Sequence, residues 1–202
     1  KKISKKKRGI VFRKISSLME SRGWGLGLVI CRPFRIDNWM EMGTLNSLEV
    51  ELFSEAISES ARPSSSCRLI LDACDVDAGR FGDNVLSSLG DSWKCCKMVS
   101  EHNMDSTDIV VGAASIIAKI TRDREMEKIS RNVGIDLGSG YPSDPKTISA
   151  IEILCNSDKP HEALRWKWAN VQKSWTKKNR NSIPKRKPKN EIDRQTSLGD
   201  WQ

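Results

Sequence analysis

The sequence contains no hydrophobic run long enough to cross a membrane. Its basic start, KKISKKKRGIVFRKI, also lacks the apolar segment that defines a signal peptide. These two absences argue against a membrane-spanning or secreted protein, and we expect a cytoplasmic one. The chain begins with Lys1 rather than Met, so we also expect its natural N-terminus to lie upstream.

No Cys-x-x-Cys pair occurs among the six cysteines, and Cys95 and Cys96 are adjacent. The missing spacing argues against a zinc site, and adjacent cysteines do not suit an ordinary disulfide. We therefore expect free thiols in a reducing compartment. The 202 residues suffice for one domain with a hydrophobic core, or for one domain with a tail.

Acidic residues are absent from two basic segments, 1–8 and 173–190, which contain six and eight Lys or Arg residues. The body between them has more acidic than basic residues, although the whole chain carries a net charge of +8. Basic segments of this kind commonly contact nucleic-acid phosphates. A solvated tail that only aids solubility explains the charge equally well.

Hydrophobic periodicity indicates alternating strands and helices. The expected strands are 24–32, 67–73 and 96–102, and the expected helices are 44–60, 77–90, 110–131 and 161–175. Turn residues mark a loop at 138–147, where Asp144 and Pro145 begin a further helix. This alternation predicts an α/β fold with a mixed sheet, and the residues after 176 are expected to form a disordered basic tail.

Carboxylates follow two of the expected strands. Asp72 ends the strand LILD, and Asp105 follows the strand at 96–102. Ligands of open α/β sheets collect at the carboxyl ends of strands, and carboxylates that converge there suit Mg²⁺. The alternative is that each Asp is a structural turn or cap residue. Asp75 and Asp77 fit capping of the next helix better than metal binding.

The chain has a single tyrosine, Tyr141, within the segment GSGYPSDP. Glycines and a proline constrain this segment, so we expect the ring to be held in a fixed loop. A ring held in this way can stack on a sugar or a base of a nucleic acid. An ordinary half-buried tyrosine in a tight turn is the alternative.

Several segments together resemble the archaeal branch of the ribonuclease HII family. They are TLNSLEVELF, LILDACDVDAGRFG, SEHNMD, VVGAASIIAKITRDREME and GIDLGSGYPSDPKT, and the resemblance covers nearly all of 1–172. It implies a ribonuclease H-like fold, in which a mixed sheet is flanked by helices and followed by a C-terminal helical extension. The expected organisation is a ribonuclease H-like domain at 1–155, the helical extension at 156–175, a basic linker at 176–194 and a binding motif at 195–202.

The resemblance implies an endoribonuclease that cuts the RNA strand of RNA–DNA hybrids and cuts 5′ of ribonucleotides embedded in duplex DNA. It also implies Mg²⁺ or Mn²⁺ as cofactors, two-metal-ion catalysis and a role in DNA replication and repair. Asp72 and Asp105 match the third and fourth of the family's four metal-binding carboxylates and are the expected catalytic residues. Tyr141 matches the tyrosine that stacks on the ribose, while Lys1 and Lys2 match a segment that contacts the substrate backbone.

The sequence departs from the family pattern at two places. Asn103 stands where the family usually has Lys. The family's Asp-Glu pair and Gly-Arg-Gly loop, which would supply two more carboxylates and contact the ribose 2′-hydroxyl, do not occur in these residues. We therefore expect a chain truncated at its N-terminus and inactive alone, because fewer carboxylates offset less of the dehydration of Mg²⁺. We also expect it to be unstable alone, because a missing central strand leaves backbone groups of its neighbours unpaired and an apolar face exposed. The alternative is a non-catalytic module that binds nucleic acid and a sliding clamp.

The last residues, QTSLGDWQ, have the spacing of a sliding-clamp-binding motif. Gln195, Leu198 and Trp201 would supply its glutamine, aliphatic and aromatic positions. The motif usually closes with two aromatics, and here Gln202 takes the last position. A frayed end is the alternative. The expected partners are RNA–DNA hybrids, ribonucleotide-containing duplex DNA and a sliding clamp, with no membrane, and we expect a monomer.

Overall fold

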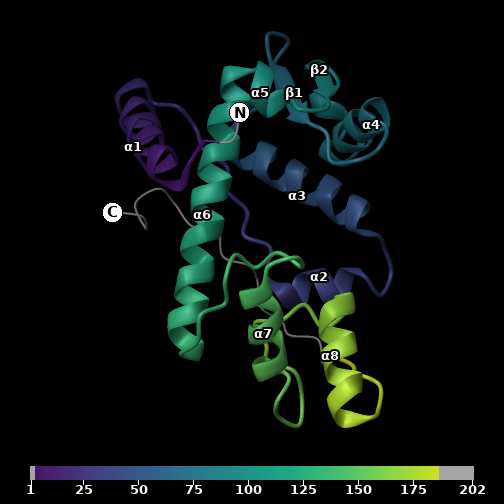
Figure 1. Cartoon of the computed structure of the whole chain (residues 1–202). Coiled ribbons are helices and arrows are strands. Elements are labelled where there is room, and N and C mark those ends of the chain that lie inside the picture. Colours follow the sequence, from purple (N-terminus) through teal and green to yellow (C-terminus); the bar gives the residue numbers. More distant parts are fainter. Residues whose placement is uncertain (1–2, 187–202) are drawn as a thin grey trace. The chain divides into compact units, whose positions relative to one another are not determined.

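The computed structural model describes residues 3–186. These residues form two compact units, each of which is described by itself. Unit 1 comprises 3–30 and 46–120, and unit 2 comprises 31–45 and 121–186. Figure 1 shows the elements along the chain. Within 3–186, no helix is both long enough and apolar enough to cross a membrane.

Unit 1 contains a parallel pair of strands with helices before and after each strand. In chain order its elements are α1 (Lys5–Arg22), α3 (Leu45–Ser60), β1 (Arg68–Asp72), α4 (Ala78–Leu89), the 3-10 helix η1 (Asp91–Trp93), β2 (Lys97–Glu101), α5 (Met104–Thr107) and the first half of α6 (Ile109–Val133). The α/β class is confirmed, and so are the elements expected at 44–60, 67–73, 77–90, 96–102 and 110–131.

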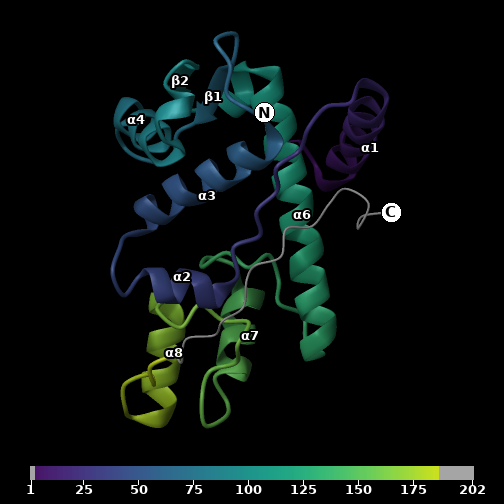
Figure 2. The ribbon, with the colours of Figure 1, turned by 180° about the vertical axis from the view of Figure 1, so that it is seen from behind.

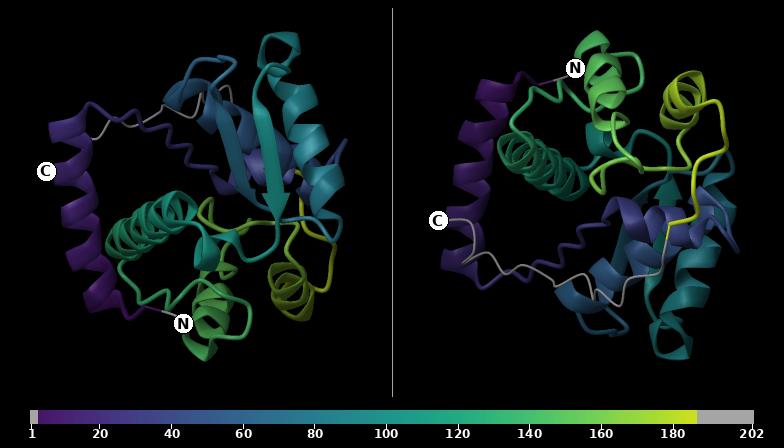
Figure 3. Two further views of the ribbon diagram at one scale, coloured as in Figure 1. Left: turned by 90° about the horizontal axis from the view of Figure 1, so that it is seen from above. Right: turned by 90° about the horizontal axis from the view of Figure 1, so that it is seen from below.

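The two strands β1 and β2 lie side by side and run in the same direction (Figure 3, left). The register pairs Arg68 with Lys97 and Asp72 with Glu101, so both strands end at the same edge. Leu69 and Leu71 are buried, whereas Asp72 lies on the opposite face of β1. Among residues 3–186, the sheet consists of this parallel pair rather than the expected mixed sheet.

The prediction of a strand at 24–32 is wrong, because this segment has no regular secondary structure. Two of its glycines instead approach the backbone of α3. A Cβ atom at Gly25 would lie 2.2 Å from the carbonyl oxygen of Ser60, and one at Gly27 would lie 1.8 Å from that of Ala56. Only glycine permits so close an approach, so the segment packs on a helix instead of pairing with a strand.

The core of unit 1 includes the buried face of α4. Phe81 and Val85 of α4 are fully buried and pack against Leu71 of β1. The ring of Phe53, from α3, meets the ring of Phe81 edge-on, with 5.2 Å between their centroids. The apolar faces of α3, α4 and β1 therefore form one cluster that fixes the position of the strand.

Two acidic residues determine where α4 begins. Asp77 Oδ1 accepts the N–H of Arg80 at 3.0 Å, which confirms its expected capping role. Asp75 accepts the N–H of Asp77 at 3.4 Å, and its carboxylate also pairs with the Arg80 guanidinium. The hydrogen bond from Arg80 lowers the pKa of Asp75. Asp75 and Asp77 thus stabilise this turn.

Unit 2 contains the second half of α6 together with α2 (Pro33–Trp39), α7 (Pro145–Leu154) and α8 (Ala169–Asn179). Helices α7 and α8 pack against each other (Figure 2). Ile151, Val171 and Trp175 belong to the buried core of this unit. Asp144 caps α7 by accepting the N–H of Lys146 at 3.0 Å, which confirms the expected start of this helix.

The helix expected at 161–175 begins later than predicted, because α8 spans Ala169–Asn179. Asp37 of α2 accepts the backbone N–H groups of Trp166 and Lys167 at 2.8 and 3.1 Å. These two hydrogen bonds hold the preceding residues in turns instead of a helix. Helix α8 also extends past residue 176 into the expected linker.

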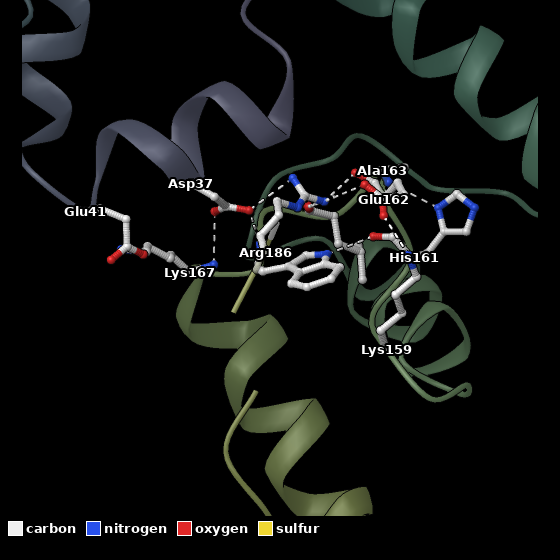
Figure 4. A network of polar contacts seen from close by, with 10 residues as sticks. Asp37, Glu41, Lys159, His161, Glu162, Ala163, Lys167 and Arg186 are labelled. Carbon is white, nitrogen blue, oxygen red and sulfur yellow. Dashed lines mark hydrogen bonds and ion pairs between the residues drawn. The ribbon is translucent and has the colours of Figure 1, made fainter. Parts of the chain in front are cut away.

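Arg186, near the end of the described chain, joins the same network (Figure 4). Its Nη1 lies 3.2 Å from Asp37 Oδ2, and its Nη2 donates to the carbonyl oxygens of Glu162 and Leu164 at 2.7 and 3.1 Å. Its guanidinium also lies over the ring of Trp166, with 4.6 Å between Cζ and the ring centroid. The side chains of Arg186 and Asp37 are only 6% and 3% exposed. The expectation that the segment around Arg186 is disordered is therefore wrong at this residue.

Candidate functional site

Asp72 and Asp105 lie in neighbouring segments of unit 1. Asp72 ends β1, and its Oδ1 accepts the N–H of Met104 at 3.1 Å. Met104 is the first residue of α5, and Asp105 is the second. The structure therefore brings the Asp72 carboxylate to the start of the helix that carries Asp105.

The turn between β2 and α5 positions Asp105. Asn103 has a left-handed backbone conformation with φ 61°, which asparagine adopts more readily than most residues. A Cβ atom at Gly112 would lie 3.0 Å from the carbonyl oxygen of Asp105, so a glycine lets the start of α6 lie close to α5. Asn103, at the position where the family usually has Lys, thus forms the turn itself.

Lys119 and two serines surround the Asp105 carboxylate. Lys119 Nζ donates to Asp105 Oδ2 at 3.2 Å and to Ser115 Oγ at 2.7 Å. Ser115 Oγ donates to the same Oδ2 at 3.2 Å, and Ser106 Oγ donates to Oδ1 at 3.2 Å. The hydrogen bond from Lys119 lowers the pKa of Asp105, and the hydrogen bonds from Ser106 and Ser115 act in the same direction. Asp105 is therefore an ionised carboxylate at neutral pH.

This arrangement offers oxygen ligands to a hard divalent cation. Mg²⁺ usually binds one or two carboxylates and keeps water or phosphate oxygens as its other ligands, so Asp72 and Asp105 fit part of such a site. The Met104 N–H bonds to Asp72 Oδ1, so a cation at this carboxylate would bind its other oxygen, Oδ2. Within the same residues, no group of three or more His, Cys, Asp or Glu side chains is placed to hold a metal ion. The pair would therefore depend on additional ligands.

Tyr141 belongs to unit 2, and the residue is 56% exposed. Its loop is fixed by Thr147, whose Oγ1 accepts the N–H of Gly140 at 2.9 Å and donates to the carbonyl oxygen of Leu137 at 2.8 Å. The guanidinium of Arg122 lies over the ring, with 4.3 Å between Cζ and the ring centroid. An exposed ring on a fixed loop is available for stacking on a nucleotide.

The remaining predicted site residues lie outside the described residues. They are Lys1 and Lys2 at one end, and Gln195, Leu198 and Trp201 at the other. Their expected contacts with the substrate backbone and with a sliding clamp stay predictions.

Three polar residues of α6 contact the candidate residues and were not identified by sequence pattern. Ser115 and Lys119 reach Asp105, and Arg122 reaches Tyr141. The separation of Ser115 and Lys119 by four positions places both on one face of a helix, which indicates a shared neighbour. Spacing alone does not identify that neighbour as Asp105.

The protein is of the α/β class, and the candidate carboxylate Asp72 lies at the edge where its two parallel strands end. The family model described as Ribonuclease HII matches residues 1–171. Ribonuclease HII of Methanocorpusculum labreanum is 39% identical over 173 residues, which cover 85% of this chain and 74% of that protein. The chain belongs to the ribonuclease HII family and is, by family, a ribonuclease.

Two solved structures have a similar fold. Ribonuclease H2 from Pyrococcus horikoshii OT3 matches with a TM-score of 0.72 and 28% identity, over 89% of this chain and 80% of that one. Ribonuclease HII from Archaeoglobus fulgidus, solved in a complex with PCNA, matches with a TM-score of 0.65 and 27% identity, over 83% of this chain and 76% of that one. The ribonuclease H-like fold expected for the chain is therefore confirmed.

Proposed function

We propose that the protein is an endoribonuclease that hydrolyses the RNA strand of RNA–DNA hybrids and cuts 5′ of ribonucleotides embedded in duplex DNA. The family membership supports the reaction class. The observation that carries the assignment to residues is the hydrogen bond from the Met104 N–H to Asp72 Oδ1, because it joins the end of β1 to the helix that carries Asp105.

Asp72 and Asp105 would hold Mg²⁺ or Mn²⁺ in this proposal. Such ions, when bound in a pair, activate water and stabilise the charge that develops at phosphorus. The N–H of Met104 orients the Asp72 carboxylate through Oδ1, and Oδ2 would bind the cation. Lys119 and Ser115 donate hydrogen bonds to Asp105 Oδ2 and fix its position. The neighbours thus fix the positions of both carboxylates, and a cation bound at Asp105 Oδ2 would replace the Lys119 ammonium there.

The proposed substrate contacts come from other parts of the chain. Tyr141 stacks on the ribose at the junction of RNA and DNA, and its exposed ring on a fixed loop supports this role. Lys1 and Lys2 contact phosphates of the substrate backbone, as their charge favours. These contacts select the substrate, whereas Asp72 and Asp105 serve the reaction.

We expect the 202-residue chain to be inactive in cleavage when it is alone. Asp72 and Asp105 match two of four family carboxylates, and no third carboxylate joins them within residues 3–186. Two anionic ligands offset less of the dehydration of Mg²⁺ than four do. The same observation favours the alternative function, a non-catalytic module that binds nucleic acid and a clamp.

Manganese binding tests the carboxylate assignment without relying on catalysis. The full chain and the D72N, D105N and D83N variants are titrated with Mn²⁺, and the electron paramagnetic resonance signal of free Mn²⁺ is measured. Asp83 is an exposed residue of α4 and provides the matched control. We expect D72N and D105N to weaken Mn²⁺ binding at least about tenfold, since even indirect partners of a metal ligand have effects of that size. If both variants bind as D83N does, Asp72 and Asp105 are not ligands.

Cleavage of a duplex containing one ribonucleotide, with Mg²⁺ or Mn²⁺ present, separates the two functions. Slow cleavage on the 5′ side that is lost in D72N supports the enzyme. Binding of the duplex without any cleavage supports the non-catalytic module.

We also propose that residues 195–202 bind a sliding clamp through Gln195, Leu198 and Trp201. The spacing of these residues supports the proposal, and the similar protein from Archaeoglobus fulgidus was solved with PCNA. Deletion of 195–202 should abolish retention of the chain on an immobilised archaeal clamp, whereas substitution of Gln202 alone should not. Equal retention of the deleted and full chains would exclude the motif.

A further inference from the structure

Arg122 makes two separate contacts with the loop that carries Tyr141. Its Nη2 donates to the carbonyl oxygen of Ser139 at 2.7 Å. Its Cζ lies 4.3 Å from the centroid of the Tyr141 ring, which is the geometry of a cation–π interaction. A planar guanidinium can satisfy both contacts at once, because its donors lie in the plane that covers the ring.

The backbone of this loop is held independently of Arg122. Thr147 bonds to Gly140 and Leu137, and Asp144 Oδ2 accepts the N–H of Ser139. Gly140 has φ 73°, and a Cβ atom there would lie 2.8 Å from Met126 Cε and 3.0 Å from Arg122 Nη2. Loss of the Arg122 side chain should therefore leave the loop in place.

Tyr141 is more than half exposed, although hydrogen bonds hold its loop. It is 56% exposed, and its backbone N–H donates to Ser139 Oγ at 3.4 Å. The Arg122 guanidinium lies over this ring. Arg122 therefore restricts the ring and covers one of its two faces.

We propose that Arg122 is the positioning residue of Tyr141: it occupies one face of the ring and directs the sugar of the substrate strand to the opposite face. The proposal rests on the proposed role of Tyr141 in stacking on a ribose. Arg122 acts through Tyr141 and makes no contact of its own with the reacting phosphate. Its loss should weaken selection of a ribonucleotide more than general affinity for DNA.

Binding of two labelled duplexes tests this role without cleavage. One duplex contains a single ribonucleotide, the other is all DNA, and anisotropy is measured without divalent cations for the full chain and its variants. We expect R122A to lower the preference for the ribonucleotide duplex about two- to fivefold, the effect that a cation–π contact at an exposed site supports. R122K should be similar to R122A, because an ammonium cannot cover the ring and bond to Ser139 together.

R131A is the matched control, since Arg131 is an exposed arginine of the same helix. R131A removes the same charge, so it should weaken binding of both duplexes equally. In a Y141A background, R122A should produce no further loss of preference. Thermal unfolding of each variant shows whether the fold is kept. If R122A is unfolded, R122K replaces it in the binding test.

The outcomes distinguish this inference from the proposed function. If the wild-type chain does not prefer the ribonucleotide duplex, or if Y141A keeps the preference, the stacking role of Tyr141 fails and the inference fails with it. If Y141A loses the preference while R122A and R122K keep it, Tyr141 stacks without help and only the inference is overturned. If R122A still lowers the preference in the Y141A background, Arg122 contacts the nucleic acid directly and is not a positioning residue.

Discussion

Replacement of Arg186 by alanine should destabilise unit 2 although the residue lies in a basic, proline-containing segment. Its side chain is 6% exposed and its Nη1 lies 3.2 Å from Asp37 Oδ2. Removing one partner of a buried ion pair usually costs about 3–5 kcal/mol, because the other charge stays buried. Asp37 keeps the N–H groups of Trp166 and Lys167, which partly offset that charge. We therefore expect the lower end of the range, about 3 kcal/mol.

Urea unfolding followed by circular dichroism measures this loss, and a thermal scan provides a second measure. For a chain of this size, about 3 kcal/mol corresponds to a melting temperature lower by about 6–12 °C. K185A is the matched control, since Lys185 is an exposed neighbour of the same charge. A chain that ends at Lys185 should likewise be less stable than one that ends at Arg186. A loss in R186A no larger than that in K185A would refute the assignment of a structural role to this ion pair.

Two further predictions concern the backbone and the effect of acid. G27A should lower the free energy of unfolding by about 1–3 kcal/mol through overpacking, because a Cβ atom would overlap the Ala56 carbonyl. G9A should instead raise the free energy of unfolding by about 0.5–1 kcal/mol, because Gly9 lies in α1 with open space around it. Urea unfolding measures both changes. Hydrogen bonds from Ser139 lower the pKa of Asp144 from 3.8 to about 2, so its contribution to stability is present above pH 4 and is lost as the pH falls toward 2. D144N should show a shallower loss of melting temperature between pH 4 and 2, and an unchanged slope would exclude this contribution.

Local pattern was sufficient for the elements whose boundaries depend on nearby residues. Asp77 and Asp144 cap α4 and α7 as expected, because a capping side chain bonds to an N–H group a few positions away. The strand β1 was also recognisable from its apolar run and the acid that ends it. In these cases the deciding interactions lie within one segment of sequence.

Elements that depend on distant contacts were predicted less well. The segment 24–32 has the composition of a buried strand, but the close approach of Gly25 and Gly27 to α3 can be seen only in three dimensions. The turn before α8 depends on Asp37, whose partner Trp166 lies 129 positions away. Periodicity carries no information on such pairs, so both errors have the same physical origin.

The candidate site shows the same division. Asp72 and Asp105 were predicted from their places at strand ends, and the structure brings their segments into contact. Lys119 and Arg122 were not assigned, because a lysine or arginine on a helix is usually solvent-exposed. Their partners, Asp105 and Tyr141, come from separate segments of the chain.

The alternation of side chains along β1 limits how this gene can change in length. Insertion or deletion of a single codon within the strand would carry Leu71 to the face that now presents Asp72, and would turn the acid toward the apolar interior. The loop at 61–66 can absorb such a change, because it lies outside any helix or strand. Related genes should therefore differ in length at this loop and conserve the number of codons between Arg68 and Asp72.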